Sequence, residues 1–113
     1  MKKLMTALVL GAMSFHAVAG GNVASGEALA KKYSCAACHG ADFNKPIDPS
    51  YPKLAGQHPE YIKHALTAYK RGDGANGRNN AIMTGQVKPL SDRDIDDLAA
   101  YLGSLQGSLA SHR

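Results

Sequence analysis

The five residues Cys35-Ala36-Ala37-Cys38-His39 carry the most specific pattern in this chain. A Cys-x-x-Cys-His run is typical of c-type heme attachment. Two thiols at this spacing lie on one side of a helical turn, so both can reach the two vinyl groups of one porphyrin. His39 follows at once, and one of its imidazole nitrogens can bind the iron as the proximal ligand. The pattern therefore predicts one heme c, joined through thioethers to Cys35 and Cys38 and ligated by His39.

Three other interpretations use the same residues. A dithiol redox site normally lies beside a βαβ pattern, and the sequence shows none. A zinc site needs four ligands, and since there is no second pair of cysteines, His58 and His64 would have to be recruited. A disulfide between Cys35 and Cys38 would close too small a loop to stabilise the fold much. Of the four interpretations, the pattern favours heme attachment.

Residues 1–19 have the pattern of a cleaved signal peptide. Lys2 and Lys3 form a positive region, residues 4–15 form a short apolar run, and Ala17-Val18-Ala19 provides a small-x-small cleavage site. The apolar run is short for a bilayer span, so an uncleaved membrane anchor is the less favoured alternative. We expect a mature domain of residues 20–113, exported to the periplasm, with no membrane span of its own.

The charge of the mature chain is small. Removing Lys2 and Lys3 from the 13 basic side chains leaves 11 against 9 acidic ones, a balance of +2. Because there is also no basic run longer than a pair, nothing supports nucleic-acid binding. One small domain buries a modest core, and a heme would add a large apolar body around which short helices can pack. Without the cofactor, we expect a poorly ordered chain.

Three segments are predicted to be helices, which indicates an all-α domain. The first has Ser25 as its expected N-cap and continues toward the heme motif. The second has Pro59 in its first turn and ends at Gly72. The third begins at Ser91, which can form a capping box with Asp94. No stretch alternates as a β-strand does.

The segments between these helices contain Pro, Gly and Asn and keep no regular period. We expect loops at residues 40–57, 73–80 and 81–89, the last of which contains Met83. A long loop in a small domain usually has a function, and wrapping the proximal side of a heme is one such function.

Met83 is the candidate sixth ligand of the iron. It is the one methionine outside the signal peptide, and a Met/His pair is a common ligand set for cytochromes. A lone methionine is more often core filling, but the heme motif upstream favours ligation here. His58, His64 and His112 are the competing side chains, and a bis-histidine iron or an open sixth position stays possible at this point.

With these residues in place, the chain resembles class I cytochromes c, in particular the small bacterial periplasmic kind. It is similar to single-heme carriers and to each half of the two-heme periplasmic cytochromes. The resemblance covers most of the mature chain: the heme motif, residues 51–62 (YPKLAGQHPEYI) and residues 90–102 (LSDRDIDDLAAYL). It implies a cytochrome c fold, with three main helices and long loops around one covalently bound heme. The chain departs from the two-heme relatives in having one motif only.

The resemblance also implies roles for particular residues. Pro52 would offer its backbone carbonyl to the ring N–H of His39, and Leu54 would pack on the heme face. The first and third helices would cross near Gly26 and Tyr101.

The predicted function is periplasmic electron transfer rather than catalysis, because two protein ligands leave the iron no site for a substrate. We expect redox protein partners, met through weak and transient contacts, and a protein that is a monomer or forms transient complexes. The alternatives are a cytochrome subunit of a larger periplasmic oxidoreductase and, if Met83 is not a ligand, a heme-based gas sensor. Candidate docking charges are Lys45, Lys53, Lys63 and Lys88.

Overall fold

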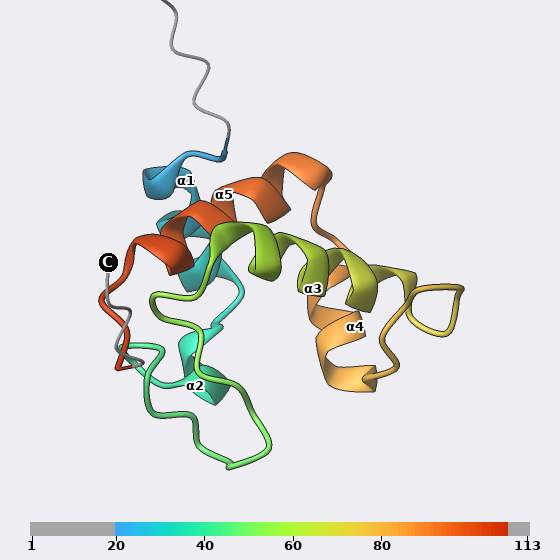
Figure 1. Cartoon of the computed structure of the whole chain (residues 1–113), viewed down its shortest axis with the longest axis horizontal. Helices are drawn as coiled ribbons and strands as arrows, with labels where there is room; N and C mark the ends of the chain where they lie inside the picture. The colour runs from blue at the N-terminus through green and yellow to red at the C-terminus, as the bar shows by residue number, and fades with distance from the viewer. Residues whose placement is uncertain (1–19, 109–113) are drawn as a thin grey trace, which may run out of the picture.

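The structure, a computed structural model, describes residues 20–108, and the predicted signal peptide lies outside this range. The described chain is all-helical, as expected, with no strand between residues 20 and 108. Its elements are α1 (Val23–Lys32), α2 (Ala36–His39), α3 (Pro59–Arg71), α4 (Ala81–Val87) and α5 (Asp92–Ser104). Figure 1 shows α1, α3 and α5 packed together, with α2 and α4 below them and apart from each other.

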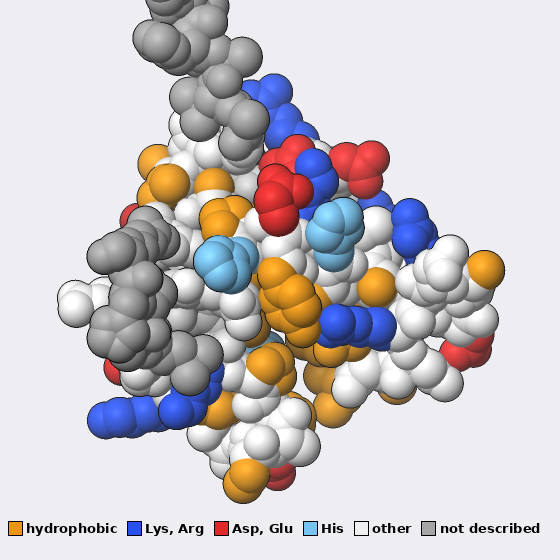
Figure 2. Space-filling model, viewed as in Figure 1, with side chains coloured by type: hydrophobic (Ala, Val, Ile, Leu, Met, Phe, Trp, Pro, Cys, Tyr) orange, Lys and Arg blue, Asp and Glu red, His pale blue; other side chains and the backbone are white. Residues whose placement is uncertain are grey.

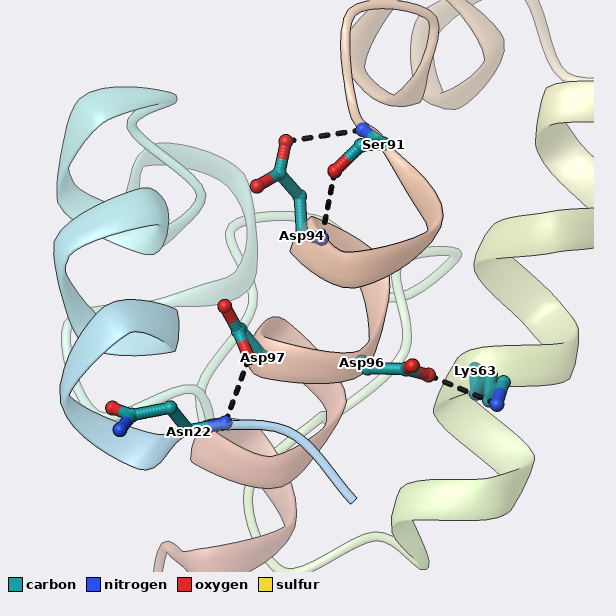
Figure 3. A network of polar contacts seen from close by, with 6 residues as sticks. All are labelled: Asn22, Lys63, Ser91, Asp94, Asp96 and Asp97. Carbon is teal, nitrogen blue, oxygen red and sulfur yellow. Dashed lines mark hydrogen bonds and ion pairs between the residues drawn. The ribbon is translucent and has the colours of Figure 1, made fainter. Parts of the chain in front are cut away.

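Helix α1 begins earlier than the sequence predicted. Its N-cap is Asn22 and not Ser25, and the Asn22 side chain accepts a hydrogen bond from the backbone N–H of Ser25 at 2.9 Å. Asn caps as well as Ser does, so local preference does not separate the two positions. A tertiary contact favours Asn22, because its own N–H donates to the Asp97 carboxylate of α5 at 2.7 Å (Figure 3).

Helices α1 and α5 make the close crossing that the resemblance implied. Gly26 is buried in α1, and a Cβ placed on it would lie 2.0 Å from the Asp97 carbonyl oxygen and 2.7 Å from the Tyr101 Cβ. Only a glycine permits this approach of two backbones. The crossing brings the two ends of the domain together, so that the heme motif after α1 and the C-terminal helix share one core.

Helices α3 and α5 follow the predicted pattern. Pro59 occupies the first turn of α3, and Gly72 ends the helix with a positive φ of 58°. Ser91 and Asp94 form the capping box of α5, with both hydrogen bonds at 3.0 Å (Figure 3). An ion pair between Lys63 and Asp96, 3.0 Å long, links the two helices on their exposed side.

One prediction about the connecting segments is wrong. Met83 does not lie in a loop but in the short helix α4, which Asn80 caps. The Asn80 side chain accepts from the backbone N–H of Met83 at 3.0 Å. Gly85 lowers the helix propensity of this segment, and only Val87 is buried, so no periodic apolar stripe marks it in the sequence. The loops at residues 40–57 and 73–80 are present as predicted.

The core is formed where α1, α3, α5 and the end of α4 meet. Its innermost side chains are Ile95 and Val87, each 1% exposed. Partly buried side chains from the heme motif and from α4 pack against the same cluster, among them Cys35, Leu54 and Met83. Within the described residues, none of the helices combines the length and the apolar character that crossing a bilayer requires.

Candidate heme site

The two cysteines are placed by a sharp turn between α1 and α2. Ser34 has a positive φ of 52°, and the N–H of Cys35 donates to the Ala30 carbonyl at 3.1 Å, which folds the motif back onto the end of α1. Cys35 itself has helical angles and leads directly into α2. Both thiols are free and partly exposed. At this spacing on one helical turn, the two sulfurs face the same side.

His39 is oriented by the chain that returns toward it. Its ring Nδ1 donates a hydrogen bond to the backbone carbonyl of Pro52 at 2.9 Å, the contact that the resemblance implied. A proton fixed on Nδ1 leaves the lone pair of Nε2 for a metal. The side chain is 6% exposed, and the Tyr51 ring lies beside it with a centroid separation of 6.3 Å.

The loop that carries Pro52 is tied to the body of the domain. Phe43, with a positive φ of 60°, accepts two backbone hydrogen bonds at its carbonyl, from Leu54 at 2.9 Å and Ala55 at 3.2 Å. The Asn44 side chain donates to the Gln106 carbonyl at 3.1 Å and accepts from the N–H of Ser108 at 3.0 Å. Hydrogen bonds therefore join the two ends of the loop to each other and join the loop to the segment that follows α5.

The thiol chemistry argues against a redox dithiol. Burial raises the pKa of the Cys35 thiol above its ordinary value, and this effect outweighs the lowering by a backbone hydrogen bond. A reactive dithiol needs the opposite shift, toward a stable thiolate. The zinc alternative has no support either, since residues 20–108 bring no three His, Cys, Asp or Glu side chains together as a metal site.

Met83 lies on α4, which Figure 1 shows apart from α2 and its heme motif. Its side chain is half-buried and packs against the core, while its neighbour Ile82 is 56% exposed. The competing ligands His58 and His64 are both exposed, and His112 lies outside the described residues. Figure 2 shows a notch in the outline between the part that carries the loop after α2 and the part that carries α4, with hydrophobic side chains on both sides.

This set of side chains fits a heme c. It offers two adjacent thiols, an imidazole with Nε2 free, a thioether, and apolar side chains at the edge of the core such as Ala36 and Leu54. Thioether linkage, nitrogen and sulfur ligation and an apolar surround are what this cofactor needs. The contact between His39 and Pro52 is observed, whereas the roles of Pro52, Leu54 and Met83 toward a heme stay predictions.

Sequence reasoning missed the contacts that place Met83. Arg78 and Thr84 flank the methionine, and both bind the end of α3. Neither belongs to a motif, and their hydrogen-bond partners lie 10 to 17 residues earlier in the chain. Only the cap carried a local signal, because Asn80 precedes Met83 by three residues, the spacing at which an N-cap side chain meets a backbone N–H.

Comparison with known proteins also indicates a heme c protein. A sequence model described as cytochrome c matches residues 23–106. The cytochrome c-554(548) of Halomonas halodenitrificans is 43% identical over 84 residues, which are 74% of this chain and 96% of that protein. The cytochrome c4 of Stutzerimonas stutzeri is 41% identical over 115 residues, covering 96% of this chain and 53% of the relative.

A solved structure agrees with these sequence matches. The crystal structure of reduced recombinant cytochrome c4 from Pseudomonas stutzeri superimposes with a TM-score of 0.67 at 41% identity, over 78% of this chain and 47% of that one. The chain thus spans about half the length of the cytochrome c4 relatives that it matches.

Proposed function

The chain belongs to the cytochrome c family, and on that premise we propose that it is a single-heme electron carrier with His39 and Met83 as the axial ligands of the iron. The observation that carries the proposal is a pair of candidate ligands, each held by its own element beside one core. One is His39, with its Nδ1 hydrogen-bonded to Pro52 at 2.9 Å, and the other is Met83, on a capped helix at the edge of the same core.

The protein's own groups have distinct tasks in this proposal. The heme, when bound through Cys35 and Cys38, supplies an iron that cycles between ferric and ferrous states. Pro52 keeps a proton on Nδ1 of His39, which directs Nε2 to the iron and raises its basicity. The apolar side chains at the rim, including Leu54, keep water from the heme face and so favour the less charged ferrous state.

Two protein ligands leave no open position for a substrate, so the proposed role is electron transfer and not catalysis. Partners would be other redox proteins, donor and acceptor, met in brief and weak encounters. Of the four lysines suggested for docking, Lys63 is paired with Asp96, whereas Lys45, Lys53 and Lys88 are exposed. We place the mature protein in the periplasm, after cleavage behind Ala19.

The test of covalent attachment is extraction with acidified acetone. The colour should stay with the protein, and its mass should exceed that of residues 20–113 by one heme. Colour that extracts freely would overturn the thioether assignment.

The test of the ligand assignment is Met83→Ala in the heme-loaded protein. The oxidised wild-type protein should show the weak near-infrared band of a sulfur-to-iron bond, and Met83→Ala should lose it, lower the reduction potential and open the iron to carbon monoxide. Ile82→Ala, a change of the exposed neighbour on α4, is the matched control and should keep the band. If the wild-type ferrous protein itself binds carbon monoxide at neutral pH, the sensor interpretation replaces this one.

A further inference from the structure

Helix α4 cannot hold Met83 in place by itself. It has seven residues, Gly85 interrupts its helix-forming sequence, and only Val87 among them is buried. A helix of this length is not stable in water without tertiary contacts. The contacts that fix α4 therefore decide where the Met83 side chain lies.

Those contacts converge on the C-terminal turn of α3. The Ala68 carbonyl accepts from the N–H of Gly72 at 3.2 Å and from the N–H of Arg78 at 2.9 Å. The Tyr69 carbonyl accepts from Gly72 at 3.1 Å and from the Thr84 hydroxyl at 3.0 Å. Carbonyls in the last turn of a helix lack partners within it, so this end of α3 is a ready site for donors from outside.

The Arg78 side chain reinforces the same junction. Its guanidinium carbon lies 5.5 Å from the Tyr69 ring centroid and 5.7 Å from the Tyr61 ring centroid, and its Nη2 donates to the Tyr61 hydroxyl at 3.3 Å. A cation over two aromatic faces is attracted to both. Tyr61 lies in the first turn of α3 and Tyr69 near its last, so the guanidinium lies along the side of this helix.

We propose that Arg78 and Thr84 are positioning residues, which dock α4 on the end of α3 and so keep Met83 available to the iron. The inference rests on the proposed function, since it concerns the same ligand. Arg78 lies two residues before the cap Asn80, and Thr84 directly follows Met83, so the two anchors bracket the methionine on both sides. Loss of either anchor loosens α4 while the core of α1, α3 and α5 stays formed.

The experiment uses the oxidised, heme-loaded protein in a denaturant titration, with two signals followed together. The near-infrared band reports sulfur on the iron, and far-UV circular dichroism reports the helices. Arg78→Ala should raise the ratio of detached to ligated Met83 roughly tenfold, the size expected for two lost cation–π contacts. The band should then disappear at a lower denaturant concentration than in the wild type, and the circular dichroism midpoint should move far less.

Matched variants separate positioning from general effects of charge or volume. Arg71→Ala removes the same charge from the last turn of α3, where Arg71 is exposed, and should leave the band unchanged. Thr84→Val removes the hydroxyl at nearly constant volume and should weaken the band, whereas Thr84→Ser keeps the hydrogen bond to Tyr69 and should restore it. Tyr61→Phe keeps the aromatic face and should cost less than Arg78→Ala.

The outcomes distinguish this inference from the ligand assignment. A wild-type protein without the near-infrared band would overturn the assignment of Met83, and the positioning role with it. The wild-type protein could show the band, with Arg78→Ala and Thr84→Val losing it at the same denaturant midpoint as the wild type. That result would overturn the positioning role alone. If the denaturant midpoints of the band and of the circular dichroism signal shift equally in both variants, the substitutions destabilise the whole fold. This result also contradicts the proposal.

Discussion

The two sides of the candidate heme site are built in different ways. On the proximal side, the two cysteines and His39 lie within five consecutive residues, and backbone groups complete the site: the Pro52 carbonyl orients the histidine, and the Phe43 carbonyl holds the returning loop. On the distal side, Met83 stands alone on a short helix, and that helix depends on side chains such as Arg78 and Thr84.

This difference has consequences for stability. Backbone hydrogen bonds persist through most substitutions, because every residue except proline keeps both groups. The junction of α4 with α3 keeps one backbone hydrogen bond, from Arg78 to Ala68, but its other contacts come from one guanidinium, two aromatic rings and one hydroxyl, so a single change can weaken it. We therefore expect the distal ligand to detach before the rest of the protein unfolds, and the proximal ligand to stay in place until the end.

Gly26→Ala should have the largest effect, because it disturbs the frame on which both sides rest. The new methyl group would overlap backbone atoms of α5, 2.0 Å from the Asp97 carbonyl oxygen, so the two helices must move apart. We expect a loss of about 3 kcal/mol in the free energy of unfolding, the upper end for overpacking. In denaturant, the near-infrared band and the circular dichroism should shift together. A band that disappears well before the helices would contradict the view of α1 and α5 as a shared frame.

The proximal side could be predicted from the sequence because its information is local. The Cys-x-x-Cys-His run specifies attachment and one ligand within a single turn, and the caps at Ser91 and Gly72 mark helix ends by their own chemistry. The wrong N-cap of α1 has the opposite cause. Asn22 is chosen over Ser25 by its contact with Asp97, 75 residues away.

The distal side could be predicted only in part, because it too depends on contacts between segments that are distant in the sequence. Counting methionines gave Met83 as the candidate ligand, but the sequence did not predict its helix, which has no apolar period and only seven residues. What makes α4 a helix is its junction with α3, through Arg78 and Thr84. Such a junction depends on two segments meeting in space, and neither segment shows it alone.

Asn44→Ala tests whether the proximal side is independent of the distal one. It removes the hydrogen bonds to Gln106 and from Ser108, so the segment after α5 should detach from the loop, at a cost of about 1 kcal/mol. Hydrogen exchange at the Ser108 amide should accelerate, and the near-infrared band should keep its wild-type midpoint. Ser108→Pro removes only the bond from the residue 108 N–H, and should lower the free energy of unfolding by about half as much as Asn44→Ala. A band that weakens in Asn44→Ala would show that the two sides are coupled.

Gly85→Ala should have the smallest effect, and of opposite sign, because it strengthens the weaker side. A Cβ at Gly85 meets no atom within 4 Å, so the methyl group costs nothing in packing. Alanine in place of glycine inside a helix gains about 0.5 to 1 kcal/mol, chiefly by restricting the unfolded chain. Since α4 carries Met83, the near-infrared band should persist to a higher denaturant concentration, with the circular dichroism midpoint nearly unchanged. Gly26→Ala is the same chemical change in a crowded helix. The two variants together therefore separate the effect of helix propensity from the effect of steric overlap. If Gly85→Ala leaves the midpoint of the band unchanged, the stability of α4 does not determine when Met83 leaves the iron. The difference between the two sides would then come from the ligands and not from the elements that hold them.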